Sequence, residues 1–393
     1  MFQGRRNVLL LATSQALMLS AIVLAVAIGA ILGDQLAPSK GLATLPIALL
    51  VIGTAITSIP ASAIMRWRGR RAGFLVGTSF GIAGSALCAL AVHRQSFATF
   101  AVGHLLLGAY QGFASYYRFA AVEATDPGHG SLAISLVVAG GIVAAFLGPQ
   151  LALWGRDWVA AQPFVGSYLA QGALSVLGLL LLTRLDMPRP TAAAGGTTRP
   201  LRTILAQPAS RVAILGAAVG GAVMTMIMTA TPLAMLGCGL PGSNVTLVVE
   251  WHVVAMFAPS FVTGTLIRHY GAPRIMQVGF LLLLAHVAVA LSGIELLHFF
   301  SALVFLGVGW NFAFVGGTAL LTRTYRPAEQ LRVQAANEFA VFGLGAVATL
   351  SAGWLQNAYG WTALNLAVVP FLIVALVAAA TVRRPRAAGG NPA

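Results

Sequence analysis

Residues 62–71 read SAIMRWRGRR, and residues 264–274 read GTLIRHYGAPR. Each stretch ends an apolar segment with basic residues and a turn glycine, Gly69 in the first and Gly271 in the second. A second matching pair, LLLGAYQG around Gly108 and VFLGVGWN around Gly307, is separated by nearly the same number of residues. A repeat with constant spacing indicates that the second half of the chain duplicates the first.

The composition places both halves in a membrane. Of the 393 residues, 58% are hydrophobic and 8% are charged, whereas soluble domains contain about 25% charged residues. Apolar stretches of the roughly 20 residues that cross a bilayer as a helix occur at 7–32, 42–64, 73–92, 98–121, 131–154, 161–183, 211–236, 245–267, 275–294, 297–321, 333–355 and 362–381. The sequence therefore predicts an all-α membrane protein with twelve transmembrane helices in two six-helix halves.

The arginines predict the orientation of this bundle. One side holds only Lys40, Arg94 and Arg156. The other side holds Arg5, Arg6, Arg66, Arg68, Arg70, Arg71, Arg184, Arg189, Arg199, Arg202, Arg211, Arg268, Arg274, Arg323, Arg326, Arg332, Arg383, Arg384 and Arg386. Because cytoplasmic loops collect Lys and Arg, we expect a multi-pass protein of the bacterial inner (plasma) membrane with both termini in the cytoplasm. Topology then explains the net charge of +14, so we expect contact with the lipid bilayer and no nucleic-acid partner.

The segment between the sixth and seventh apolar stretches is rich in Pro, Gly, Thr and Arg, a composition typical of a linker. It divides the chain into an N-terminal half at 1–190, a cytoplasmic linker at 191–204 and a C-terminal half at 205–393.

Two homologous six-helix halves with a basic loop after the second helix resemble the major facilitator superfamily. The loop motif of that family has the form G-x-x-x-D-R-x-G-R-R, and this chain keeps Gly69, Arg70 and Arg71 while Ser62 and Arg66 replace the first Gly and the Asp. The resemblance implies a secondary transporter working by alternating access, without enzymatic activity or a bound cofactor. It also implies a monomer, with a conformational role for Gly69, Arg70 and Arg71.

Substrate sites in such transporters lie near the bilayer midplane between the halves, and one cluster of soft side chains falls within the predicted spans. Five of the ten methionines lie within residues 224–256. Met224 and Met228 are four residues apart and share one helix face, as do His252 and Met256 on the next helix. The turn between these helices is centred near residue 240, so we expect Met228 to lie level with His252, and Met224 level with Met256.

Three thioethers and one imidazole are neutral, soft or borderline ligands, which select Cu(I) over Mg, Ca or Mn. The alternative, without metal binding, is that the methionines fill irregular helix contacts. Met235 would extend the soft face outward, and Cys238 at the mouth would pass a cuprous ion inward, so both are candidate relay residues. Met226 should point away from the other methionines.

M-x-x-x-M followed by H-x-x-x-M is similar to the CcoA-like branch of the major facilitator superfamily, whose characterised members import copper for haem-copper oxidase assembly. The resemblance implies that Met224, Met228, His252 and Met256 bind copper as the transported substrate. The main prediction is therefore import of copper, as Cu(I), into the cytoplasm.

Three rival interpretations remain open. Related sequences include riboflavin importers, in which aromatic residues would stack on a flat ring and the methionines would only line the pocket; the candidates are Tyr110, Phe113, Tyr116, Trp310 and Phe314. Gly148 and Pro149 suggest a drug/proton efflux antiporter. A membrane-embedded copper sensor or haem-binding scaffold would transport nothing.

Overall fold

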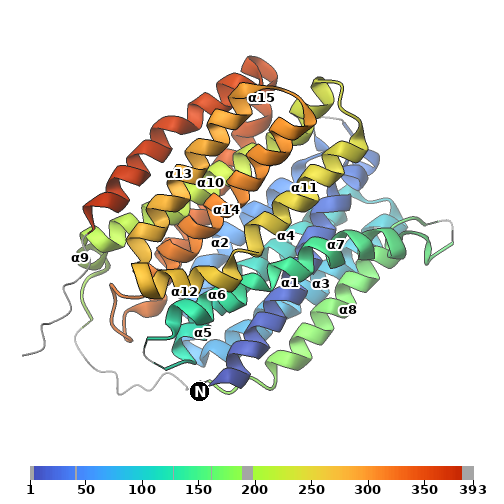
Figure 1. Cartoon of the computed structure of the whole chain (residues 1–393). Helices are drawn as coiled ribbons and strands as arrows, with labels where there is room; N and C mark the ends of the chain where they lie inside the picture. Colours follow the sequence, from blue (N-terminus) through green and yellow to red (C-terminus); the bar gives the residue numbers. More distant parts are fainter. Residues whose placement is uncertain (1–3, 40–41, 127, 161, 188–197, 383–393) are drawn as a thin grey trace, which may run out of the picture.

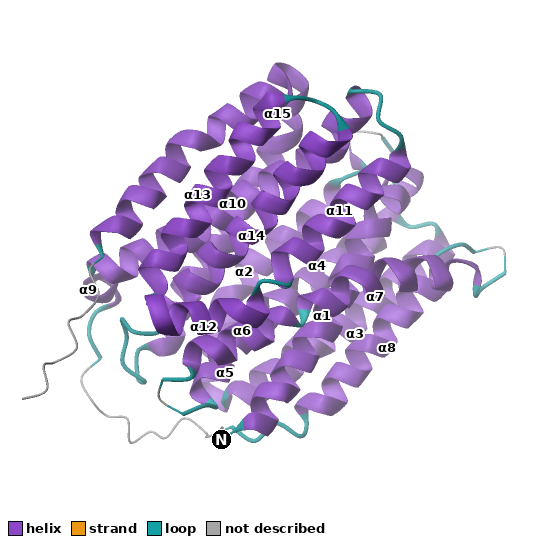
Figure 2. Ribbon diagram, viewed as in Figure 1, coloured by secondary structure: helices purple, strands orange, loops and turns teal. Residues whose placement is uncertain are grey.

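The computed structural model describes residues 4–39, 42–126, 128–160, 162–187 and 198–382. These residues form helices and loops, with no strand among them (Figures 1 and 2). The first group of elements comprises α1 (Arg5–Leu36), α2 (Leu45–Arg68), α3 (Arg70–Arg94), α4 (Phe97–Ala114), α5 (Tyr117–Glu123), α6 (Gly130–Ala139), α7 (Gly141–Trp154), the 3-10 turn η2 (Gly155–Asp157) and α8 (Val165–Leu182). The second comprises α9 (Leu201–Leu205), α10 (Pro208–Gly237), α11 (Gly242–Phe257), α12 (Ser260–Tyr270), α13 (Ala272–Ser292), α14 (Leu296–Leu321) and α15 (Gln330–Thr381).

Ten helical stretches in this part of the chain are long and apolar enough to cross a membrane. One of them, α15, turns back at Gly360, whose φ of 77° is left-handed. Beyond the turn, Trp361 donates to the carbonyl of Ala290 at one end of α13, and Gln277 at the other end of α13 donates to the carbonyl of Ala379. The two arms of α15 therefore cross separately. With α4 and α5 as one further crossing, the all-helical membrane fold predicted from the sequence is confirmed.

Close helix contacts in the first group depend on small residues. A Cβ placed on Gly108 of α4 would lie 2.0 Å from the carbonyl oxygen of Leu50 on α2. The Thr54 hydroxyl donates to the carbonyl of Gly108 at 3.1 Å across the same contact. Small residues that let backbones approach closely are typical of helix packing in membranes.

The two groups of helices meet along α2 with α15, α6 with α12, and α7 with α11. In Figure 1 the blue-to-green helices lie on one side of this boundary and the yellow-to-red helices on the other. Ser62, near the end of α2 that carries the arginines, donates to the carbonyl of Leu331 at 2.8 Å. Ser131 on α6 donates to the carbonyl of Gly264 on α12 at 3.0 Å. The basic ends of the two groups are thus held together.

The predicted linker at 191–204 falls partly outside the described residues, because residues 188–197 are not described. Its described end is fixed to the C-terminal group by Arg199, whose guanidinium lies 2.6 Å from the Glu329 carboxylate. This guanidinium lowers the pKa of Glu329 to about 2. The boundaries at 1–190 and 205–393 stay a prediction.

Candidate functional site

Three of the predicted spans are interrupted partway, although the sequence predicts each as one continuous helix. The fourth breaks between α4 and α5, the fifth at Gly140 between α6 and α7, and the eighth at Ala258 and Pro259 between α11 and α12. Figure 2 shows the last break as a short loop within the bundle. A Cβ on Gly141 would lie 2.4 Å from the Phe257 ring, so the second and third breaks adjoin each other. Broken helices at membrane depth are typical of transporter binding sites.

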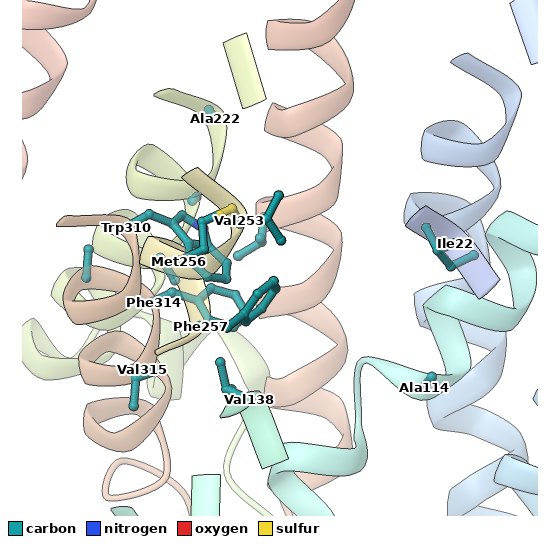
Figure 3. Packing of buried hydrophobic residues seen from close by; sticks show 14 of the residues in the cluster. Ile22, Ala114, Val138, Ala222, Val253, Met256, Phe257, Trp310, Phe314 and Val315 are labelled. Carbon is teal, nitrogen blue, oxygen red and sulfur yellow. The ribbon is translucent and has the colours of Figure 1, made fainter. Parts of the chain in front are cut away.

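An aromatic cluster lies beside these breaks. We define it as Phe257 of α11 with Trp310 and Phe314 of α14. The rings of Trp310 and Phe314 are stacked, with centroids 4.9 Å apart and planes 16° apart. Phe257 meets Trp310 edge-on at 5.7 Å. Figure 3 shows the three rings gathered with Met256 between α11 and α14.

Contacts with α14 show how deep in the bundle the α11 residues lie. The Asn311 amide donates to the carbonyl of Met256 at 2.7 Å. A Cβ on Gly307 would lie 2.8 Å from the backbone nitrogen of Met256. His252, one turn further out, is bonded to the carbonyl of Leu303 at 2.8 Å. Met256 is therefore level with Gly307, and His252 with Leu303.

Contacts with α14 also show the depth of the α10 methionines. A Cβ on Gly220 would lie 3.1 Å from the Cβ of Ala313, and α10 runs antiparallel to α14. Continuing along both helices places Met224 near residue 309 and Met228 near residue 305. Each lies about two residues, or roughly 3 Å, from the level of its predicted partner. α10 and α11 both pack on α14 and contact each other only slightly. The structure thus places the four residues at matching depths, and their metal binding stays a prediction.

The imidazole of His252 has one fixed and one free nitrogen. A carbonyl oxygen accepts hydrogen bonds only, so Nδ1 carries the proton and donates to Leu303. Nε2 then has a lone pair, and it has no partner among the described residues although the side chain is fully buried. This arrangement, with one nitrogen anchored to a backbone carbonyl, suits a metal ligand. It equally suits a hydrogen-bond acceptor for a substrate N–H or O–H group.

The other soft side chains lie apart from this level. Met235 is fully buried near the outer end of α10, and Cys238 is exposed on the turn that follows. Met226 is buried, whereas Met224 and Met228 are half-buried. Within the described part of the chain, no group of three or more His, Cys, Asp or Glu side chains is placed to hold a metal ion.

Three other aromatic residues considered for ring stacking lie outside the aromatic cluster. Tyr110, Phe113 and Tyr116 are at most 2% exposed. Tyr110 packs against Gly81 and Phe113 against Gly77, both on α3. Tyr110 and Phe113 thus turn into the N-terminal group, whereas Tyr116 lies beside Arg70 at the contact with α15. Stacking of these three rings on a substrate stays a prediction.

A buried ion pair beneath the aromatic cluster was not foreseen. The guanidinium of Arg118 on α5 lies 2.5 Å from the carboxylate of Glu338 on α15. It also donates to the Thr318 hydroxyl at 3.2 Å and lies 4.4 Å from the Phe314 ring. The sequence places both charges near the inner ends of their spans, where each could reach water alone. Only the packing of the two halves shows that they are partners.

The conformational loop forms a second polar contact across the halves. Gly69 ends α2 with a left-handed φ of 87°, and Arg70 is buried while Arg71 is exposed. Arg70 forms an ion pair with Glu123 and donates to the Gln334 side chain on α15 at 2.6 Å. The motif marks Arg70, but nothing in the sequence marks its two partners. The loop therefore connects three helices from both halves.

Comparison with known proteins decides the family. A model of the Major Facilitator Superfamily matches residues 9–310. The chain belongs to this superfamily. It is 38% identical over 391 residues to the riboflavin transporter RfnT of Brucella anthropi, covering 99% of this chain and 98% of that protein. It is 28% identical to the uncharacterized MFS-type transporter YddS of Bacillus subtilis, covering 90% and 85% of the two chains.

Solved structures of facilitators share the fold. The fucose:proton symporter FucP of E. coli superposes with a TM-score of 0.77 at 18% identity, covering 96% of this chain and 98% of that one. A bacterial homologue of the iron transporter ferroportin gives a TM-score of 0.71 at 12% identity, with 95% and 98% covered. These likenesses concern the fold alone.

Proposed function

We propose that this facilitator imports riboflavin or a closely similar flat heteroaromatic solute. The observation that carries the proposal is the stacked pair of Trp310 and Phe314 beside the helix breaks. The 38% sequence identity to a riboflavin transporter over nearly the whole chain supports it. Flat rings bind between or on aromatic side chains, and each such stack contributes about 1–3 kcal/mol.

A polar group of such a solute finds a partner about two helical turns further out than Trp310, level with Leu303. The free Nε2 of His252 accepts a hydrogen bond from a ring N–H or a side-chain hydroxyl of the solute. Met256 packs beside the rings, and its thioether adapts to an irregular apolar surface. Uptake of radiolabelled riboflavin by cells with and without the gene tests the proposal; equal uptake in both would reject it.

Copper is the second candidate substrate. The comparisons give no support to the copper-importing branch expected from the sequence, and the relative covering 99% of the chain is named for riboflavin. The observation that favours copper is the anchored imidazole of His252, with thioethers at matching depths on α10 and α11. In this candidate, Met224, Met228, His252 and Met256 bind the ion directly.

Conservative substitution of the methionines separates the two candidates. Leu nearly matches Met in volume, and such changes cost less than about 1.5 kcal/mol of stability, but Leu has no sulfur. We expect the Met224→Leu, Met228→Leu double variant to keep riboflavin uptake within about twofold of wild type, as Met226→Leu should. Copper accumulation measured in the same cells should not depend on these residues. A loss of copper accumulation in the double variant alone would favour copper.

We also propose that the protein is a monomer of the bacterial inner membrane with cytoplasmic termini, and native Cys238 tests the orientation. It is exposed beyond the outer end of α10, whereas Cys88 is buried. An impermeant maleimide should label the wild type in intact spheroplasts. A Cys238→Ser, Arg332→Cys variant, with its cysteine on the exposed basic end of α15, should react only after permeabilisation. Labelling of this variant in intact spheroplasts would contradict the proposed orientation.

A further inference from the structure

Helices α4 and α14 occupy equivalent positions in the two halves, and their contacts with the neighbouring helices align them. A Cβ on Gly77 of α3 would lie 2.2 Å from the Cβ of Phe113 on α4. A Cβ on Gly279 of α13 would lie 3.0 Å from the Cβ of Phe312 on α14. Phe113 and Phe312 are therefore equivalent, with the same offset that relates the first glycines of LLLGAYQG and VFLGVGWN.

This alignment matches Gln111 of α4 to Trp310 of α14, the indole of the stacked aromatic pair. The helices beside them agree. When α2 and α11–α12 are aligned on the turn glycine that follows each, Thr54 matches Met256. The Thr54 hydroxyl lies 3.3 Å from the Gln111 amide, and Met256 lies beside Trp310 (Figure 3). Gln111 therefore holds in the N-terminal half the place that Trp310 holds in the C-terminal half.

The exposed side of α4 shows where Gln111 points. Val102 is an exposed large apolar side chain of α4, at 49%, so it marks the side that faces lipid. Gln111 lies about two and a half turns further along and thus on the opposite side of the helix. Its side chain is half-buried. The exposed part of this amide therefore faces the inside of the bundle.

Arg118 shows that Gln111 and Trp310 lie at similar depths. The guanidinium of Arg118 on α5 lies 4.4 Å from the Phe314 ring on α14. Gln111 lies roughly 10 Å further out than Arg118 along α4 and α5, and Trp310 roughly 6 Å further out than Phe314. Because α4 ends at Ala114, Gln111 also adjoins a helix break. The amide and the indole thus lie at one level in opposite halves.

The Gln111 amide has hydrogen-bonding capacity to spare. Its Oε1 faces the Thr54 hydroxyl at 3.3 Å, and its Nε2 donates to no described residue. The hydroxyl has a single proton, for which the carbonyls of Leu50 and Gly108 compete at 2.9 and 3.1 Å. The amide therefore offers an acceptor and a donor side by side.

An acceptor beside a donor is complementary to the edge of a cyclic imide or lactam, in which a ring N–H adjoins a C=O group. Riboflavin carries such an edge on one end of its fused ring system. A solute whose ring plane lies on the stacked aromatic pair must direct its polar edge toward the opposite half. Among the polar side chains, Gln111 meets this edge because it is at the right depth and faces inward.

We propose that Gln111 binds the imide edge of the solute and selects for it. Oε1 accepts from the ring N–H, and Nε2 donates to the adjacent C=O group. The free Nε2 of His252, further out, is then left for a side-chain hydroxyl of the solute. The inference rests on the proposed function, whose binding site it completes from the N-terminal half.

The test pairs a change in the protein with a change in the solute, using purified full-length protein and quenching of flavin fluorescence. In 3-methylriboflavin a methyl group replaces the proton of the imide N–H. The wild type should bind this compound about tenfold more weakly than riboflavin, which is the effect of about one hydrogen bond. Gln111→Leu should bind riboflavin about tenfold more weakly than the wild type, and should bind both compounds equally within about twofold.

Two further variants control for structural effects. Gln277→Leu removes an amide on α13 that donates to the carbonyl of Ala379, and it should prefer riboflavin as the wild type does. Gln111→Glu keeps the size and the acceptor but has no N–H. It should bind riboflavin more weakly than the wild type and still prefer it to the methylated compound.

The outcomes separate this inference from the proposed function. A tenfold preference for riboflavin retained by Gln111→Leu would overturn the role of Gln111 alone, as would a wild type that binds both compounds equally well. Loss of the preference in Gln277→Leu would also count against it. A wild type that binds neither compound would overturn the proposed function, and this inference with it.

Discussion

Gly264→Val should abolish solute uptake while the protein remains folded and in the membrane. A Cβ on Gly264 of α12 would lie 2.6 Å from the carbonyl oxygen of Ser131, 2.8 Å from the Cα of Leu132 and 2.9 Å from the Ser135 hydroxyl, all on α6. The two nearest of these atoms belong to the backbone of α6, which cannot move aside as the end of a flexible side chain can. Valine adds still more volume, and it should hold the inner ends of the halves apart. We expect riboflavin uptake below about a tenth of the wild-type rate.

The matched control is Gly343→Val on α15, where a Cβ would meet nothing within 4 Å. Both glycines lie within helices, so the helix-propensity cost of the two changes is similar and small. Gly343→Val should transport normally. Fluorescence-detected size-exclusion chromatography should show similar yields of both variants. Wild-type uptake by Gly264→Val would show that the close contact between α6 and α12 is not needed for transport.

Much of the fold could be predicted because the bilayer imposes simple rules. Apolar stretches of fixed length mark the crossings, and the arginines mark their basic ends. The helix breaks at Gly140 and Pro259 could not be predicted in the same way. Glycine and proline occur at many places in these spans without a break, for example Pro60 inside α2. Local sequence does not show which of them the neighbouring helices will accommodate.

The depths of the candidate-site residues could be predicted only for residues that lie on one helix hairpin. Met224, Met228, His252 and Met256 lie on helices joined by a short turn, so counting residues from the turn gives their depth. The ion pair of Arg118 and Glu338 joins residues 220 positions apart. Its formation depends on how the two halves pack, which no local pattern records.

The aromatic residues show that residue type alone does not predict the direction in which a side chain points from its helix. When the repeats LLLGAYQG and VFLGVGWN are aligned on Gly108 and Gly307, Tyr110 matches Gly309, so Trp310 lies one residue further along and about 100° further around its helix. Tyr110 packs into its own half against Gly81, whereas Trp310 contacts Phe257 beside the helix breaks. The residue type alone marked both rings as candidates, and the one-residue offset in the repeat is the signal that separates their helix faces.

Trp310→Ala should weaken riboflavin binding by roughly 5- to 150-fold, because loss of one aromatic stack costs about 1–3 kcal/mol and 1.4 kcal/mol is tenfold in affinity. Trp310→Phe keeps a ring over Phe314 and should lose much less. Trp354→Ala, which removes an indole that is 62% exposed on α15, should bind as wild type. Quenching of riboflavin fluorescence by purified protein measures all three. Undiminished binding by Trp310→Ala would exclude the stacked pair as the platform for the ring, and would leave the copper candidate as the better explanation of this site.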